Sequence, residues 1–598
     1  MRRLSFFLFP TLFLLAVAAT LPAQENDLGK KVYDKWCEQC HGPEGQGDGV
    51  AAPRLKPKPR DFTTGKYKVR STLTGQLPTD EDLKNAIRRG LYYSAMPGFP
   101  ALSDQEVDAV VEYVKAFSPD FADPELVAQA QPISIPAPPP YDAETAASEG
   151  KKIYEETGCG RCHGALGRGD GNSAPTLVDD WGNHVRIADL TMPWTFRGGG
   201  SRRDIYRTMS TGFFGTPMPG FYGNLAATQE ESDQRMWAIV DYMYYLAGLE
   251  PSADDQPPEA PYKNRMVAVA TDEEIDLSRG KELFADAPKS MFPLVGQVIE
   301  PGRNFHPSVY ALTAQAIYND DDVAFLLTWN DMRAETSGSN APDLTAPLWD
   351  DELAALGLAP TAGDEEGDLW GDAAEDEGDV WGDAAEDEGD IWGDAAEEED
   401  VWGDAAEDEG GEEDFWGEGE DEAGAATPTG PDFEFNDAVA LQFPQAMPAG
   451  VRRPYFLFGD AQNPVDIWFR DLGAAATVVY TGRGSAAISP AESDVPETSV
   501  SYVDGEWEVI MKRSRRGRSS ISFEEDTFVP VTFSVWDGFN RERGNKRALT
   551  GWRYVYVEPR EEPQWQAPVA KTFGGILVLE VLLIALVRRS KRRNNPRL

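Results

Sequence analysis

The sequence predicts a multidomain chain: two all-α domains, then an all-β sandwich with a disordered acidic insertion, and a transmembrane helix at the C-terminus. Three observations predict this order. A cysteine and histidine motif recurs in the first half, short apolar runs separated by turn signals fill the second half, and one long apolar run lies near the C-terminus. At 598 residues the chain is too long for one hydrophobic core, because cores stop growing near ~250–300 residues.

The N-terminus has the features of a secretory signal peptide over residues 1–23. Arg2 and Arg3 form a positively charged start, residues 4–19 are apolar, and cleavage near Ala23 is expected. A permanent N-terminal anchor is the alternative, but the apolar run is short for a full membrane span. We therefore expect an exported protein.

All four cysteines of the chain belong to two Cys-x-x-Cys-His motifs. The residues are Cys37, Cys40 and His41 in the first motif and Cys159, Cys162 and His163 in the second. This spacing is typical of c-type haem attachment, in which both thiols bond the haem and the histidine binds its iron. A redox dithiol and half a zinc site are the alternatives. A zinc site would need further ligands, and the remaining histidines are His184 and His306.

A methionine follows each motif at the same distance. The separation from His41 to Met96 is 55 residues, as is the separation from His163 to Met218, and both methionines begin a Met-Pro-Gly-Phe segment. A lone methionine is usually a core filler. Two in matched contexts predict the second axial ligands of the haem irons. Histidine paired with methionine raises the haem potential and leaves no open position for a substrate.

An opening helix leads into each motif, and an amphipathic helix closes each unit. In the first unit Ser103 is a candidate N-cap, and apolar side chains recur at helical spacing after it. Together with the motifs, residues 28–118 and 148–248 resemble two class I-type cytochrome c domains, separated by a proline-rich linker over 119–147. The resemblance implies two haem c groups and one-electron transfer without bond-making chemistry.

The second half of the chain changes from helical to strand periodicity. Short apolar or alternating runs bounded by turn signals predict an all-β sandwich over 265–335 and 430–560. The predicted strands are 309–317, 323–329, 433–443, 465–469, 477–480, 499–502, 506–511, 529–536 and 552–557.

Short motifs give this sandwich a family resemblance. They are Leu327-Thr328-Trp329-Asn330-Asp331, Ala440-Leu441-Gln442-Phe443-Pro444, Pro464-Val465-Asp466-Ile467-Trp468, Asp504-Gly505-Glu506-Trp507 and Trp536-Asp537-Gly538. They resemble the haem-binding domain of the ethylbenzene dehydrogenase gamma subunit, a family that includes electron-transfer subunits of molybdenum enzymes related to dimethyl sulfoxide reductase. The resemblance implies a b-type haem between a methionine and a lysine, and Lys546 matches the lysine. Phe458 stands where the family commonly has the methionine, so the alternative is a sandwich that has lost its haem and serves as a docking module.

An acidic low-complexity insertion over 336–429 interrupts the sandwich. Residues 364–422 hold 30 acidic side chains and neither Lys nor Arg, which accounts for most of the net charge of -47. Such charge density cannot bury enough surface to fold alone, so we expect a disordered solvated loop, with a tether for a basic partner as the alternative. The negative charge argues against nucleic acid as a partner.

The apolar run over 567–587 predicts a transmembrane helix, because about 20 residues span a bilayer. The basic segment 588–598 predicts a cytoplasmic tail and places the preceding chain outside. Glu580 lies inside the run, where a charge is costly in lipid, and a surface helix is the alternative. We therefore expect a single-span protein of the bacterial inner membrane with its bulk in the periplasm.

These features together predict an electron-transfer protein rather than an enzyme. It would be a membrane-anchored periplasmic multihaem cytochrome that passes electrons between a redox enzyme and another carrier. A molybdenum oxidoreductase of the dimethyl sulfoxide reductase family is the candidate enzyme, and another cytochrome is the candidate carrier. A docking subunit of a respiratory complex is the alternative. A haem enzyme such as a peroxidase is disfavoured, because both irons would have six ligands.

Overall fold

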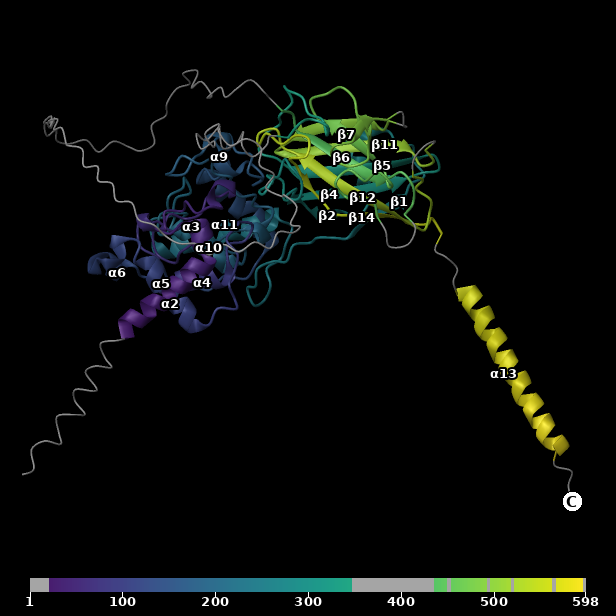
Figure 1. Cartoon of the computed structure of the whole chain (residues 1–598), viewed down its shortest axis with the longest axis horizontal. Coiled ribbons are helices and arrows are strands. Elements are labelled where there is room, and N and C mark those ends of the chain that lie inside the picture. The colour runs from purple at the N-terminus through teal and green to yellow at the C-terminus, as the bar shows by residue number, and fades with distance from the viewer. Residues whose placement is uncertain are drawn as a thin grey trace, which may run out of the picture.

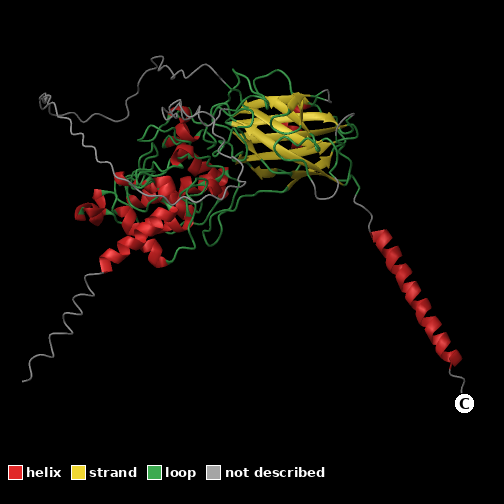
Figure 2. Cartoon of the chain, viewed as in Figure 1, coloured by secondary structure: helices red, strands yellow, loops and turns green. Residues whose placement is uncertain are grey.

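The computed structural model describes residues 21–346, 435–448, 453–491, 495–517, 521–561 and 566–594. The N-terminal part is helical, the following part is built of strands, and one helix stands apart at the C-terminus (Figure 1). Figure 2 shows that the strands form a single body beside the helices. The predicted signal peptide over 1–23 and the predicted insertion over 336–429 lie almost entirely outside the described residues.

The first helical unit packs its opening helix α2 (Leu21–Trp36) against its closing helix α5 (Asp104–Lys115). Gly29 permits the close crossing, since a Cβ there would collide with the carbonyl of Ala109. The other helices of this unit are α3 (Glu38–His41), α4 (Asp80–Arg89) and α6 (Pro124–Gln129). Ser103 caps α5 as predicted, with its side chain accepting from the Glu106 amide.

The second helical unit repeats this crossing. Its opening helix is built from α7 (Ala143–Thr145), a π-helical turn (Ala146–Gly150) and α8 (Lys151–Glu156), and it packs against α11 (Gln229–Leu246). A Cβ on Gly150 would collide with the carbonyl of Ala238. The helices α9 (Gly160–His163) and α10 (Arg202–Thr211) complete the unit. The two units are therefore structural copies, as the repeated motifs predicted.

The β-rich part is a 14-stranded mixed sheet, in which eleven strands follow the order β10-β11-β5-β4-β1-β14-β12-β6-β7-β8-β9, while β2 pairs with β4, and β13 pairs with β12 and β3. Strand β1 pairs in parallel with β4 and β14, and the other pairings of the described strands are antiparallel. The strands are β1 (Arg265–Ala270), β2 (Ser290–Pro293), β3 (Val295–Gly296), β4 (Ala311–Tyr318), β5 (Asp322–Asn330), β6 (Ala438–Pro444), β7 (Val465–Asp471), β8 (Val478–Gly482), β9 (Ile488–Pro490), β10 (Glu497–Val503), β11 (Glu506–Ser514), β12 (Thr527–Trp536), β13 (Ala548–Leu549) and β14 (Arg553–Val557).

Strand β12 folds this sheet over a shared core. Its residues 527–531 pair with β14, whereas 532–536 pair with β6, so the two halves of the sheet face each other. The ring of Phe325 on β5 lies 6.0 Å from the rings of Phe443 on β6 and Trp468 on β7. The predicted strands all coincide with observed ones. The predicted all-β sandwich is thus corrected to one continuous mixed sheet.

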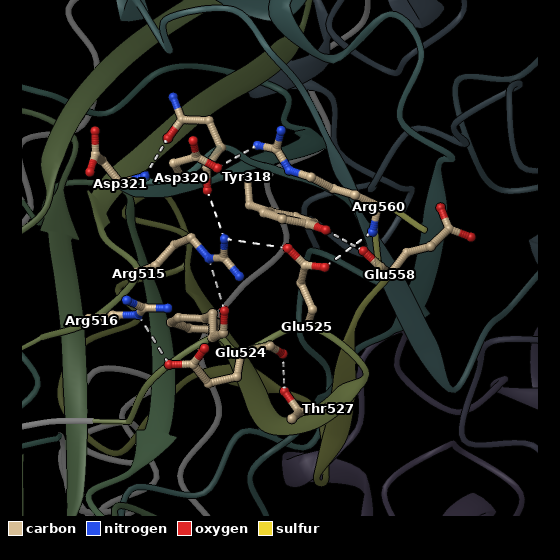
Figure 3. A network of polar contacts seen from close by, with 12 residues as sticks. Tyr318, Asp320, Asp321, Arg515, Arg516, Glu524, Glu525, Thr527, Glu558 and Arg560 are labelled. Atoms are coloured by element: carbon tan, nitrogen blue, oxygen red, sulfur yellow. Dashed lines mark hydrogen bonds and ion pairs between the residues drawn. The ribbon is translucent and has the colours of Figure 1, made fainter. Parts of the chain in front are cut away.

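A polar network surrounds the turn between β4 and β5 (Figure 3). The Arg515 guanidinium donates to the carbonyl of Phe523 at 3.0 Å and to that of Asn319 at 2.9 Å, and lies 4.4 Å from the Tyr318 ring centroid. Arg560 pairs with Asp320 at 3.1 Å. These contacts join the β4–β5 turn to the segments that follow β11 and β14.

The C-terminal helix α13 (Gln566–Asn594) corrects a second prediction. None of the helices in the described parts of the chain is both long and apolar enough to cross a membrane. The predicted transmembrane helix over 567–587 and the single-span location in the bacterial inner membrane are therefore wrong, whereas the tail over 588–598 stays a prediction. The physical reason lies in the charges: Glu580 interrupts the apolar run and Arg588 and Arg589 follow it at once.

Candidate haem centres

The first Cys-x-x-Cys-His motif lies on the single turn of α3 directly after α2. Cys37 and Cys40 are both half-buried and free of disulfides, and the amide of Cys40 donates to the carbonyl of Cys37 at 3.1 Å. The hydroxyl of Tyr33 donates to the carbonyl of Gly42 at 2.6 Å, which fixes the chain just after the buried His41. The helix therefore presents two thiols and an imidazole within one turn.

A backbone carbonyl orients the ring of His41. Its Nδ1 lies 2.9 Å from the carbonyl oxygen of Arg60, and the Phe62 ring stacks on it at 4.3 Å. A carbonyl oxygen only accepts, so Nδ1 carries the proton and Nε2 keeps its lone pair. Burial lowers the pKa of His41, which also favours the neutral ring. This is the tautomer that binds iron through Nε2.

The second motif has the same geometry. The Nδ1 of His163 lies 3.0 Å from the carbonyl oxygen of Ala188, and burial lowers the pKa of His163. The hydroxyl of Tyr154 donates to the carbonyl of Gly164 at 2.6 Å, as Tyr33 does in the first unit. Both imidazoles are therefore held with Nε2 available. No sequence pattern could identify the two carbonyl partners, because every residue type carries a backbone carbonyl.

Each predicted ligand methionine lies in a tight loop after the third helix of its unit. The carbonyl of Met96 accepts from the Leu91 amide at 3.0 Å, and the carbonyl of Met218 accepts from the Phe213 amide at 3.1 Å. Ser94 in the first loop and a threonine in the second accept from the methionine amide at 3.2 and 3.3 Å. The two loops thus form the same pair of hydrogen bonds. Both methionines are half-buried.

The thiols fit thioether bonds better than redox chemistry. Burial raises the pKa of Cys37 to about 12 and also raises the pKa of Cys40, Cys159 and Cys162. A redox dithiol needs a lowered pKa, so that a thiolate exists near neutrality. A thioether sulfur carries no charge and tolerates the same burial. A zinc site is also disfavoured, because the cysteines and histidines of the described residues form no group of three metal ligands.

Half-buried cations of the two helical units lie near one another. Burial lowers the pKa of Arg60 and Arg197, and burial together with these two guanidinium groups lowers the pKa of Lys68 to about 8. The carboxylate of Asp179 lies 3.9 Å from the Lys68 ammonium and offsets part of this charge. The remaining positive charge suits the carboxylate groups of a haem, so the side chains here fit that cofactor.

The segments that carry the two predicted sites also touch each other. The Arg60 guanidinium lies 4.3 Å from the Trp181 ring centroid, and a Cβ on Gly215, in the Met218 loop, would lie 2.7 Å from the same ring. Arg70 of the first unit donates to the carbonyl of Thr211 in the second at 2.7 Å. The carbonyl partner of His41 and the loop of Met218 therefore meet at Trp181, which sequence reasoning did not single out.

The residues of the tentative b-type haem site do not fit that group. Lys546 is buried in the turn after β12, and its amide donates to the carbonyl of Arg543 at 2.9 Å. Phe458 is 1% exposed, and the Arg547 guanidinium lies 3.7 Å from its ring centroid. Met447, the nearest methionine in sequence, is exposed. An aromatic ring packed on a cation thus occupies the place of the expected sulfur ligand.

Three families of known proteins match successive parts of the chain. Residues 24–114 match subunit III of cbb3-type cytochrome c oxidase, residues 147–247 match cytochrome c, and residues 281–548 match ethylbenzene dehydrogenase. The matches follow the two helical units and the β-rich part in order. They bear out the resemblances that the motifs predicted.

The individual relatives are similar to this chain over only part of its length. A protein of Haloferax mediterranei described as a respiratory nitrate reductase heme subunit is 28% identical over 156 residues, which are 26% of this chain and 55% of that protein. The chlorate reductase subunit gamma of Ideonella dechloratans is 31% identical over 120 residues, which are 20% of this chain and 48% of that protein. The chain thus spans about half the length of these relatives.

Among solved structures, a chain of the Kuenenia stuttgartiensis reducing HAO-like protein complex is 40% identical. The match covers 37% of this chain and 95% of that chain, with a TM-score of 0.34.

Proposed function

Because this chain is a multihaem cytochrome that joins two cytochrome c domains to an ethylbenzene dehydrogenase domain, we propose that it is the electron-transfer subunit of a molybdenum-type reductase. Relatives named as nitrate and chlorate reductase subunits support this class of partner. In this proposal the catalytic subunit of that reductase, and not this chain, binds the substrate. This chain would carry electrons between the reductase and a second carrier.

In this proposal each cytochrome c domain holds one haem c. Cys37 and Cys40 bond the first haem and His41 and Met96 bind its iron, while Cys159, Cys162, His163 and Met218 do the same for the second. A haem ligated in this way takes up or gives up one electron at its iron. The single observation that carries the proposal is the duplicated imidazole geometry, in which a backbone carbonyl leaves Nε2 free twice.

Packing between the domains supports electron passage within one chain. Trp181 lies between Arg60, whose carbonyl holds His41, and the loop of Met218. The guanidinium group of Arg60 against Trp181 adds positive charge at this junction. These contacts support electron passage between the two predicted sites within one chain.

The proposed function is tested by purifying the native complex from its source organism. We expect the haem chain to co-purify with a larger subunit that contains molybdenum, and the reduced haems to be reoxidised when the substrate of that subunit is added. Isolation of the haem chain with no redox enzyme, or haems that stay reduced on addition of nitrate, chlorate and related oxyanions, would contradict it.

A role as a haem enzyme is tested separately. Two irons that each have a histidine and a methionine ligand offer no open position, so the reduced protein should not bind carbon monoxide. Carbon monoxide binding by the untreated reduced protein, together with peroxide turnover, would favour an enzyme instead.

A docking role for the ethylbenzene dehydrogenase domain is the second candidate. The packing of Arg547 on Phe458, where a sulfur ligand is expected, favours a domain without its own haem. Acid-acetone extraction should then release no haem from the purified chain, because both haems are covalent. Release of one extractable haem per chain would favour a three-haem conduit.

A further inference from the structure

Three strand ends deliver acidic side chains to one edge of the sheet. Asp331 follows β5, Asp437 precedes β6 and Asp537 follows β12. Glu335 approaches the same point from the segment after β5, and its amide donates to Asp437 at 2.9 Å. The proposed electron transfer makes no use of these groups.

Three of the carboxylates are close enough to share one ion. Asp331, Glu335 and Asp437 each offer an oxygen, and these oxygens all lie within 4.8 Å of one another. Asp437 is fully buried, and Asp331 is 5% exposed. Like charges at this distance repel strongly away from water. A compensating cation or a bound proton is therefore required.

Two of these carboxylates each have one buried oxygen without a hydrogen-bond partner. The Oδ2 of Asp331 and the Oε2 of Glu335 are buried and accept no hydrogen bond from any described residue. Asp437, in contrast, is held in place: Oδ1 accepts from the Gly538 amide at 2.8 Å, and Oδ2 accepts from the Trp507 Nε1 at 3.1 Å. The cluster thus combines one carboxylate held by hydrogen bonds with two carboxylates that each keep a buried oxygen without a partner.

The nearby cation of the protein does not neutralise the cluster. Arg333 pairs with the other oxygen of Glu335 and is 52% exposed, so it lies on the solvent side. A divalent cation would compensate the like charges of these buried carboxylates.

We propose that Asp331, Glu335 and Asp437 bind a calcium ion at this edge of the sheet. An all-oxygen donor set with no sulfur or imidazole selects a hard cation over zinc or copper. Calcium is favoured over magnesium, because its irregular shell of 6–8 oxygens tolerates donors that come from three separate segments, and water can fill the remaining positions.

The ion would fix the surface on which the second cytochrome c domain docks. Asn330, next to Asp331, donates to the carboxylate of Asp189 in that domain at 2.6 Å. The amide of Asp331 donates to the carbonyl of Gly505 at 2.9 Å, and Gly505 packs against Asp170 of the same domain. Calcium binding should therefore stabilise both the sheet edge and this interface.

The proposal is tested on the purified, haem-loaded full chain. After treatment with a chelator, we expect isothermal titration to show one tight calcium site with a dissociation constant of about 10⁻⁷–10⁻⁵ M, the range of regulatory all-oxygen sites. Saturating calcium should raise the unfolding temperature by about 5 °C. The acidic residues 364–422 will add weak sites, which the variants below separate from the tight one.

The decisive variant is Asp331→Asn, with Asp466→Asn as its matched control. Asp466 is also buried and has an unpartnered Oδ2, but it lies on β7. Asp331→Asn should lose the tight site and the thermal shift while unfolding in chelator at the wild-type temperature or above, because it removes repulsion. Asp466→Asn should keep both the tight site and the shift.

Two results would overturn the calcium site. One is a wild-type chain with neither a tight calcium site nor a calcium-dependent unfolding temperature. The other is an Asp331→Asn chain whose tight site and thermal shift equal those of the wild type, which would place calcium elsewhere. If Asp331→Asn does not fold, Glu335→Gln at the more exposed member of the cluster replaces it, with the same expectations.

Discussion

At the scale of single residues, two backbone carbonyls decide which imidazole nitrogen is available. The motifs predicted His41 and His163, but not their partners Arg60 and Ala188, which lie 19 and 25 residues further along the chain. A carbonyl can be supplied by any residue, so no pattern of residue types could have identified it. The predicted ligands Met96 and Met218 lie in matching loops, and their bonds to iron stay a prediction.

Replacing a predicted ligand methionine should shift one haem and spare its attachment. Met96→Ala and Met218→Ala should each lower the potential of one haem by on the order of 0.1–0.3 V, within the ~0.8 V that axial ligands span. Each variant should also lose the sulfur-to-iron absorption band of that haem. Spectroelectrochemical titration measures both effects.

Met209→Ala is the matched control for these variants. Met209 is a buried core methionine in the helix before the Met218 loop. It should cost about 2–5 kcal/mol of stability and leave both potentials unchanged. A ligand variant that kept its potential and its absorption band would show that the sulfur is not bound to iron.

A buried ion pair should make the stability of the second cytochrome c domain depend on pH. Arg202 pairs with Asp241 at 2.7 Å, and burial raises the pKa of Asp241 to about 6 while Arg202 opposes that shift. The native carboxyl then binds its proton more tightly than the unfolded one. The free energy of unfolding should therefore fall as pH rises from about 4 to about 6, and Asp241→Asn should remove this part of the profile.

Removing the buried cation Arg202 should lower the free energy of unfolding more than removing an exposed cation. Arg202→Ala leaves a buried carboxylate unpaired and should cost about 3–5 kcal/mol at pH 7, measured by denaturant unfolding. Arg235→Ala, which breaks a pair with Glu156 at the surface, should cost at most about 1 kcal/mol. Equal losses in the two variants would refute the difference in burial as the cause.

At the scale of elements, local sequence patterns predicted most of the strands, but they did not predict which distant strands pair. Apolar alternation predicted β4, β5 and β7 within a few residues of their bounds. It did not predict β1, which pairs in parallel with β14 across a large separation in sequence. The acidic cluster was missed for the same reason, because Asp331, Asp437 and Asp537 meet only after three distant strands pair.

The contact between β5 and the second cytochrome c domain depends on one amide. Asn330→Asp would place a second carboxylate against the half-buried Asp189, and should cost at least about 2 kcal/mol of docking free energy. We expect faster proteolysis of the segment 252–261, between the two domains. Asn319→Asp, at the opposite end of β5 and able to keep its turn contacts, is the control.

At the scale of the whole molecule, the sequence predicted the order of the domains correctly and their relation to a membrane wrongly. Two repeated motifs sufficed to predict two helical units, since each unit is local in sequence. The prediction of a membrane helix was wrong because the apolar length of 567–587 was given more weight than the charges of Glu580, Arg588 and Arg589 that limit it. Phe458 stands where the family commonly has a methionine, so this single residue distinguishes the β-rich domain from the common pattern of its family.

The most direct test is the intact mass of the chain, purified from its native source and denatured. Two covalent haems should raise the mass above that of the polypeptide by two haem groups, and Cys37→Ser with Cys40→Ser should remove one of them. Cys159→Ser with Cys162→Ser should remove the other. A native chain with the mass of the polypeptide alone, or with one haem that survives both double substitutions, would contradict the assignment of two haem c sites.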